Sequence, residues 1–401
     1  MENMNNVNAK FDYFQSKLIM AFNESFPLVR KSRKRAKDKK WMSQGLRVSI
    51  RQKDRLYKKK IQSPTQHNID RYKDYKSSVD TLIKAAETKY YQELFSEKSK
   101  SAINMWKALG SIISPGKKKS NNRITKLKIG DEWIENNREI SNAMNNHFCT
   151  IGSKLASELP AGKAYHTYLK NGVNQSIFLA PIHETEITLE IDKLKTKKSP
   201  GYDDISPRLL KICKDDICKP LTTLFNNSIE SATYPDKLKI SKVVALYKKE
   251  SHYVPDNYRP ISLLTSIDKI FEKLLYKRFI KFIEKQKIII LEQYGFLRKH
   301  STISALIDNI DNIRNYIDNG EYVLSIYLDL RKAFDTVDHK ILLGKLHHYG
   351  FRGHVNDLIQ SYLSDRKQYT TINGVESNMQ NIPMGVPQGS VLGPFFSYIR
   401  Q

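Results

Sequence analysis

The sequence predicts an α+β fold in which a basic helical region, residues 1–175, precedes a mixed region, residues 176–401. Three observations support this prediction. The first region carries apolar side chains at three- and four-residue steps, which is the period of an amphipathic helix. The second region contains a continuous apolar run over 322–328, typical of a buried strand, and several loops marked by Gly and Pro. A chain of 401 residues with 40% apolar residues can bury the cores of two or three domains.

Charge is the most informative bulk property. The chain has 67 Lys and Arg against 42 Asp and Glu, a net charge of +25 and a pI near 9.6. Such an excess favours a polyanionic partner, because each phosphate contact releases condensed counterions. A basic surface that serves only solubility is the alternative. No stretch approaches the ~20 apolar residues of a membrane-spanning helix, so nucleic acid is favoured over a membrane.

The three cysteines show no metal-ligand spacing, because Cys213 and Cys218 lack a second pair. Reduced thiols in an intracellular protein are the expected state. The polar start of the chain lacks the apolar core of a secretory signal. We therefore expect an intracellular location, nuclear and/or cytoplasmic. The oligomeric state is not predicted.

Local signals predict the elements of the first region. Ser43 is expected to cap a helix over 44–60, and a stripe of tyrosine and aliphatic side chains predicts a second helix over 69–95. Three further elements are expected: a short helix over 106–113, a hairpin over 123–135 and a helix over 139–159. In the hairpin, Trp133 is expected opposite Leu127.

The densest charge lies between Arg30 and Lys60. Within this stretch, Arg33, Lys34 and Arg35 are candidates for a phosphate-binding arm or a nuclear localisation signal. A solvated helical face is the alternative for any single lysine.

The second region is predicted to contain a helix over 185–194, a helix opened by Ser206 and Pro207, a strand over 322–328 and a helix over 340–350. Lys197 and Lys198 lie in a basic loop before Ser206. This loop joins two predicted helices and could contact nucleic acid.

Asp329 ends the predicted strand and is the candidate metal ligand. Hard divalent ions such as Mg²⁺ prefer carboxylate oxygens. Phosphoryl transfer to a growing strand uses two ions about 3.5–4 Å apart, and one aspartate cannot hold both. Helix caps and turns explain most strand-end aspartates, so the neighbours decide the interpretation. Phe334 follows five residues later, and an ordinary core Phe is its alternative.

The most specific motif is Gly385-Val-Pro-Gln-Gly389. Glycine lets backbone approach a ligand closely where a Cβ would clash. A plain turn rarely has this composition. The motif therefore indicates a binding loop, with Gln388 as its polar side chain.

Taken together, these motifs resemble the palm of a reverse transcriptase, and the run Phe334-Asp-Thr-Val-Asp-His339 is typical of non-LTR (LINE-type, jockey-like) retrotransposons. The resemblance implies an RNA-directed DNA polymerase that uses an RNA template, a DNA primer, deoxynucleoside triphosphates and two Mg²⁺ ions. It also implies the fingers and an incomplete palm of a right-hand polymerase over 176–401, after a basic linker over 1–175. Asp329 would be the catalytic, metal-binding residue, and Asp335 would cap the next helix.

The resemblance extends to further blocks. The stretch 242–262 resembles the fingers hairpin, and 293–302 resembles a turn into a helix that contacts the template. The implied nucleotide-binding residues are Arg259, Lys248, Lys249, Phe334, Gln388 and Gly389. The implied nucleic-acid-binding residues of this region are Arg298, Lys299, Lys197 and Lys198.

In this family an aromatic-x-Asp-Asp block supplies the remaining carboxylates, and the 401 residues contain none after Asp329. We therefore expect a palm that is truncated before this block and inactive as given. A strand without its hairpin partner would expose an edge and lower solubility. Two alternatives stay open: a non-catalytic nucleic-acid-binding remnant and an unrelated basic helical scaffold.

Overall fold

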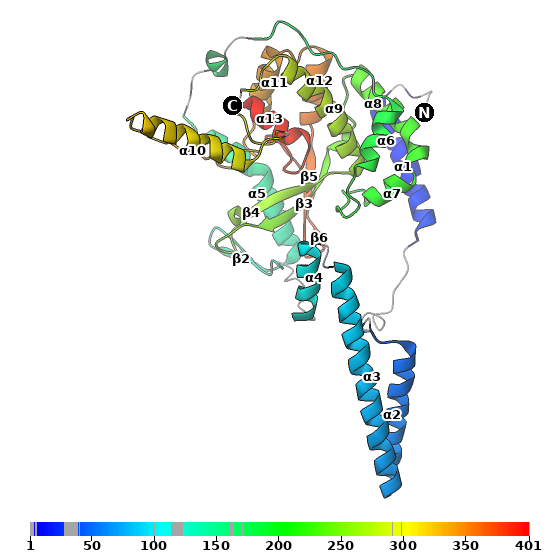
Figure 1. Ribbon diagram of the computed structural model, residues 1–401. Helices are drawn as coiled ribbons and strands as arrows, with labels where there is room; N and C mark the ends of the chain where they lie inside the picture. The colour runs from blue at the N-terminus through cyan, green and yellow to red at the C-terminus, as the bar shows by residue number, and fades with distance from the viewer. Residues whose placement is uncertain are drawn as a thin grey trace. The chain divides into compact units, whose positions relative to one another are not determined.

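The computed structural model confirms a mixed α+β fold (Figure 1). It describes residues 4, 6–27, 39, 41–98, 101–113, 123–160, 162, 164–169, 172–290, 292–297 and 299–400. Contacts divide the chain into a larger unit, Met1–Phe26 with Asn122–Gln401, and a smaller unit, Pro27–Asn121. These divisions differ from the predicted boundary at residue 175. Among the described residues, no helix is both long enough and apolar enough to span a membrane.

The smaller unit is built from the helices α2 (Gln44–Gln62), α3 (Gln66–Lys98) and α4 (Ala102–Ile113). The predicted cap of α2 is confirmed, because the Ser43 hydroxyl accepts the N–H of Leu46 at 3.2 Å. The α2–α3 seam buries Leu56 and Val79. Both predicted helices are therefore present, each slightly longer than expected.

The larger unit contains a five-stranded sheet in the order β4-β3-β5-β6, with β7 also paired to β5. Its strands are β3 (Ile240–Tyr247), β4 (Tyr258–Leu263), β5 (Lys367–Ile372), β6 (Val375–Glu376) and β7 (Gln380–Asn381). The β3–β4 pair is an antiparallel hairpin, as the 242–262 block predicts. The β3–β5 pair is parallel and joins segments more than a hundred residues apart.

One face of this sheet is covered by α5 (Asn137–Ser157). The apolar core between them consists of Ile140, Met144, Phe148, Val243, Tyr258 and Ile372 together with Ile124 and Leu127. Asn145 of α5 is also buried, and its amide donates to the carbonyl of Gln368 in β5 at 3.3 Å. Residues of the predicted linker region therefore pack directly on the sheet.

The hairpin of β1 (Leu127–Ile129) and β2 (Glu132–Ile134) forms as predicted, with Gly130 in its turn at φ +60°. Its predicted pairing was wrong by one residue. Trp133 lies opposite Lys128, and Leu127 lies opposite Ile134. Leu127 is fully buried in the core beneath α5, which sets the register.

A second, helical core makes up most of the larger unit. Its helices are α1 (Val7–Ser25), α6 (Glu184–Asp192), α7 (Pro207–Ile212), α8 (Lys214–Glu230), α9 (Ser266–Lys285), α11 (His339–His348), α12 (His354–Leu363) and α13 (Leu392–Arg400). At its centre the rings of Phe225 and Phe271 stack with centroids 4.4 Å apart. The predicted cap Ser206 opens α7, with Pro207 as its first residue.

The segment 321–330, called here the Asp329 segment, forms no strand and is exposed throughout. The predicted strand over 322–328 was therefore wrong. Leu324 is 87% exposed and Leu328 is 90% exposed. No strand among the described residues pairs with the segment, so its backbone groups have no ladder to join. The preceding helix α10 (Thr302–Asp318) also buries no residue and stands apart from the other helices in Figure 1.

Candidate functional site

The loop of residues 384–391, called here the Gln388 loop, is held on two sides by backbone hydrogen bonds. On one side, Gly385 N–H donates to Val337 and Val386 N–H donates to Phe334, both at 2.9 Å. On the other side, the Gln388 carbonyl accepts the N–H of Ser262 in β4 at 2.9 Å. The loop therefore joins the turn that follows Asp329 to the predicted fingers hairpin.

The two glycines of the loop explain how it can lie so close to both neighbours. Gly385 has φ +89°, and a Cβ there would lie 2.8 Å from the Asp335 carbonyl oxygen. Gly389 has φ +130°, and a Cβ there would lie 2.7 Å from the Ser262 carbonyl oxygen. Both glycines are thus required by close contact with the protein's own backbone, and their predicted approach to a ligand stays a prediction.

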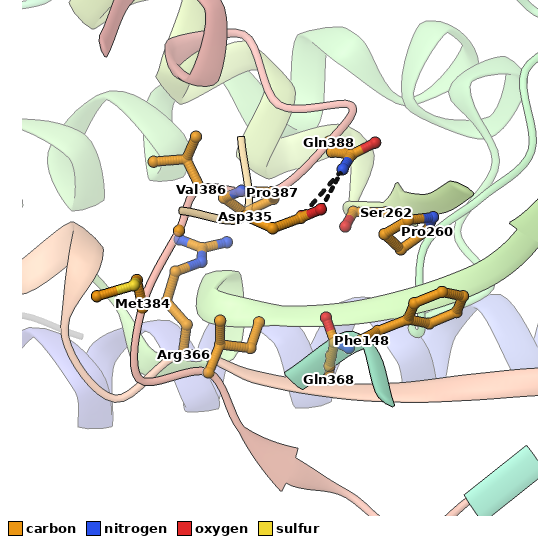
Figure 2. A pocket seen from close by; sticks show the side chains of 12 residues that line it. Phe148, Pro260, Ser262, Asp335, Arg366, Gln368, Met384, Val386, Pro387 and Gln388 are labelled. Carbon is orange, nitrogen blue, oxygen red and sulfur yellow. Dashed lines mark hydrogen bonds between the residues drawn. The ribbon is translucent and has the colours of Figure 1, made fainter. Parts of the chain in front are cut away.

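The Gln388 side chain donates to both carboxylate oxygens of Asp335 at 2.9 Å (Figure 2). Burial raises the pKa of Asp335, while the Gln388 hydrogen bond and the charge of Lys332 act in the opposite direction. The expected role of Asp335 as a helix cap was wrong. Asp338 caps α11 instead, accepting the N–H of Ile341 at 2.9 Å. No sequence signal pairs Asp335 with Gln388, because the two are 53 residues apart.

A cavity of about 20 Å³ lies beside this pair, and Figure 2 shows its lining. A volume of this size holds about one water molecule, so the cavity is too small for a nucleotide. Arg366 lines the cavity and is 1% exposed. Its Nη1 donates to the Tyr362 carbonyl at 3.0 Å, whereas Nε and Nη2 have no hydrogen-bond partner among the described residues. Sequence reasoning missed Arg366, which no motif marks.

Two buried acids of α9 lie behind the loop. The Tyr234 hydroxyl donates to Asp268 at 2.5 Å, and the Tyr362 hydroxyl donates to Glu272 at 2.6 Å. Glu272 also accepts the N–H of Val391 at 2.7 Å, which holds the end of the Gln388 loop. Burial raises the pKa of both acids, and the nearby Arg366 charge opposes this shift.

The three basic candidates of the β3–β4 hairpin reach solvent. Arg259 lies on β4 opposite Leu246 and is exposed. Lys248 is exposed just beyond β3, and Lys249 pairs with Glu250 at 3.3 Å. The three side chains therefore belong to one hairpin, and Lys249 forms an ion pair with Glu250 of its own loop.

Asp329 is exposed within the Asp329 segment. Among the described residues, no group of three or more His, Cys, Asp or Glu side chains is placed to hold a metal ion. A single exposed carboxylate does not fit a site for two divalent ions, which needs several shared oxygen ligands. The residues described here therefore do not by themselves form a two-metal centre.

The remaining candidates are scattered. Phe334 is partly buried against the helical core, and its ring centroid lies 6.1 Å from that of Phe296. Lys197 and Lys198 are exposed beyond α6, and Lys299 is exposed before α10 at φ +63°. Four predicted nucleic-acid-binding residues lie outside the described residues: Arg33, Lys34, Arg35 and Arg298.

Part of the chain is similar in sequence to known proteins. Residues 247–399, which include β4, the Asp329 segment and the Gln388 loop, match the family described as reverse transcriptase (RNA-dependent DNA polymerase). The RNA-directed DNA polymerase from mobile element jockey of Drosophila melanogaster is 32% identical over 228 residues, 57% of this chain and 25% of that protein. The probable RNA-directed DNA polymerase from transposon BS of the same species is 29% identical over 269 residues, 66% of this chain and 29% of that protein.

The probable RNA-directed DNA polymerase from transposon X-element of Drosophila melanogaster is 32% identical over 248 residues, 60% of this chain and 26% of that protein. The chain thus spans between a quarter and a third of the length of these relatives. Residues 247–399, which contain β4 and the Gln388 loop, thus form a reverse transcriptase domain similar to those of jockey-like non-LTR retrotransposons.

Proposed function

We propose that this chain is a part of an RNA-directed DNA polymerase that copies an RNA template from a DNA primer. The observation that carries the proposal is the Gln388 loop, which is held between the turn after Asp329 and strand β4 within the family-matched residues. The hairpin would be part of the fingers of a right-hand polymerase. The sheet and the Gln388 loop would be part of its palm.

The proposed nucleotide site lies between the hairpin and the Gln388 loop. Arg259 and Lys248 are the exposed cations available to a triphosphate, and Arg adds bidentate geometry. Lys249 would first have to leave Glu250. Phe334 would lie beneath the sugar. Gln388 and Gly389 would contact the nucleotide, although the Gln388 amide already donates to Asp335.

The proposed nucleic-acid contacts lie on loops and on the basic N-terminal stretch. They are Lys197, Lys198, Arg298, Lys299, Arg33, Lys34 and Arg35. Basic side chains of this kind bind phosphates without reading sequence. We propose a nuclear and/or cytoplasmic location.

Reverse transcriptases in general depend on a divalent metal ion. We propose Mg²⁺ as that ion, with Asp329 as one of its ligands. Its chemistry would be to stabilise the charge that develops as a phosphodiester bond forms. Because the described carboxylates do not fit two ions, we propose that the chain by itself binds nucleotide and nucleic acid without catalysing extension.

A second candidate function is that of a non-catalytic nucleic-acid-binding remnant. The exposure of Asp329, with no metal-binding cluster among the described residues, favours this alternative. The net charge of +25 supports nucleic-acid binding under either proposal.

Primer extension tests both candidates. The chain and its Asp329→Ala variant are given an RNA template, a DNA primer, Mg²⁺ and deoxynucleotides, and binding of the same hybrid is measured in parallel. We expect hybrid binding by both proteins and extension by neither. Extension that Asp329→Ala abolishes would show that the chain catalyses and would overturn the proposed inactivity. Absence of binding would overturn both candidates.

A further inference from the structure

The smaller unit is a helical hairpin whose two helices differ sharply in charge. The helix α2 carries seven Lys or Arg and a single acid, Asp54. The helix α3 carries six Lys or Arg and six Asp or Glu. Both helices are long and polar, so a need for solubility alone would not concentrate the excess of positive charge on α2. The asymmetry points to a partner that contacts α2.

The packing of the hairpin decides which face of α2 is free. Leu46 and Leu56 of α2 are buried. On the same side, Lys53 pairs with Asp80 at 3.6 Å and the rings of Tyr57 and Tyr72 lie 5.4 Å apart. The face turned toward α3 is therefore occupied by apolar, aromatic and ion-pair contacts.

The opposite face carries a basic stripe, defined here as Arg51, Arg55, Lys58 and Lys59. Arg51, Arg55 and Lys59 follow each other at four-residue steps, and Lys58 lies three residues after Arg55, so the four residues share one side of the helix. All four are exposed, and none forms an ion pair with another described residue. Asp54 lies beside the stripe and is exposed without neutralising it.

The dimensions of the stripe suit a nucleic-acid backbone. Eight residues separate Arg51 from Lys59, which at 1.5 Å per residue is about 12 Å. One strand of a duplex carries a phosphate about every 3.4 Å along its axis, so roughly three or four phosphates span the same distance. Four cations of one sign on a rigid helix therefore match a short run of phosphates.

A membrane surface fits this helix less well. Interfacial helices insert a continuous apolar face, whereas the apolar side chains of α2 mostly face α3. The exposed Val48 and Ile61 lie more than three turns apart and form no continuous face. The stripe also offers no apolar rim for a folded acidic protein. A phosphate backbone needs neither feature.

We propose that the basic stripe of α2 binds the phosphate backbone of nucleic acid, independently of base sequence and separately from the reverse transcriptase unit. Such contacts would hold RNA or DNA on the smaller unit without reading its sequence. The proposal does not depend on polymerase activity.

Salt-dependent binding by the full chain tests the proposal. One variant carries Arg51→Gln, Arg55→Gln, Lys58→Gln and Lys59→Gln. The matched control neutralises four exposed basic residues of α3 and so has the same net charge: Arg71→Gln, Lys73→Gln, Lys76→Gln and Lys84→Gln. Affinity for a 20-nucleotide single-stranded RNA, and for a DNA duplex of the same length, is measured by anisotropy at several salt concentrations. Circular dichroism checks that helix content is retained.

For single-stranded RNA, log K falls with log[salt], and we expect the α2 variant to make this slope less negative by about 3, the value for four lost phosphate contacts. The α3 control should change the slope by less than about 1. Affinity should fall at least roughly tenfold in the α2 variant, with similar losses on RNA and on DNA. Equal losses in the two variants, or anionic vesicles binding where nucleic acid does not, would overturn the proposal. These outcomes can be read whether or not primer extension occurs.

Discussion

The Gln388 loop and the Asp329 segment contain residues that the family resemblance assigns to one site. The two segments differ in their backbone hydrogen bonds and in their exposure to solvent. The loop forms backbone hydrogen bonds with Phe334, Val337 and Ser262. The Asp329 segment is exposed along its whole length and lies in no sheet. Apolar content does not explain the difference, since the segment is the more apolar of the two.

The difference shows that a buried strand needs a partner for its backbone as well as apolar side chains. The Gln388 loop finds its partners inside the larger unit, where two glycines permit the close approach. The Asp329 segment has no such partner among the described residues, and the adjacent α10 buries none of its side chains. One half of the candidate site is therefore built by internal contacts, and the other half is not.

The largest effect is expected at Glu272, which anchors the end of the Gln388 loop. Glu272→Ala removes the acceptor of both the Tyr362 hydroxyl and the Val391 N–H in a fully buried position. Two buried donors without partners should lower the free energy of unfolding by about 4 kcal/mol. Urea denaturation measures this loss. Glu284→Ala changes an exposed acid of the same helix and is the control, with an expected change within about 0.5 kcal/mol.

A smaller loss is expected from Gly385→Ala. The alanine would have to adopt the φ of +89° that Gly385 has, and its Cβ would lie 2.8–2.9 Å from backbone atoms of Asp335 and Phe334. We expect the free energy of unfolding to fall by about 3 kcal/mol. Gly353→Ala is the matched control, because Gly353 also has a positive φ, +54°, but nothing lies within 4 Å of its Cβ position. Its loss should be smaller, about 2 kcal/mol, because only the cost of the backbone conformation remains. Similar losses in both variants would show that the close approach of the loop does not matter.

A pH-dependent effect is expected from Asp335→Asn. Burial raises the folded-state pKa of Asp335, so its contribution to stability is fully present below its ordinary value of 3.8 and is lost as pH rises through the raised value. Asparagine cannot titrate. The stability of the wild type relative to the variant should therefore decrease as pH rises above 4, in thermal melts followed by circular dichroism. The Gln388 hydrogen bond and the Lys332 charge oppose the upward shift of the pKa, so we expect a pH-dependent effect of about 1 kcal/mol. A constant difference across pH would contradict the burial of Asp335.

The smallest effect on stability is expected in the Asp329 segment. Leu324→Ser with Leu328→Ser should change the free energy of unfolding by no more than about 0.5 kcal/mol, because both side chains are already exposed. The same change should raise the concentration at which the chain stays soluble, measured by light scattering. Leu346→Ser in the buried core of α11 is the contrast and should cost several kcal/mol. A comparable loss in the segment would mean that it is packed.

Sequence reasoning succeeded where a structure depends on neighbours along the chain. Ser43 and Ser206 cap the predicted helices, because a cap is a contact over three residues. The turn of the β1–β2 hairpin was found for the same reason, whereas its register was missed by one residue. That register depends on the burial of Leu127 beneath α5, which the hairpin sequence does not contain.

The candidate site shows the same limit. Gln388 and the two glycines were identified from their own motif, but their neighbours Asp335 and Ser262 were not, since these contacts join residues 50 or more positions apart. Arg366 carried no sequence signal at all. It lines the cavity because the parallel pairing of β3 with β5 brings the residues around 366 next to the hairpin.

The sequence by itself determined the family resemblance, the basic character, most helices of the N-terminal region and the residue types of the Gln388 loop. All of these are encoded in short runs or in overall composition. The tertiary structure alone decided that Glu272 and Asp335 hold the Gln388 loop, and that the apolar run before Asp329 remains exposed. Burial and hydrogen bonding depend on which distant surfaces meet, and no local pattern of residues contains that information.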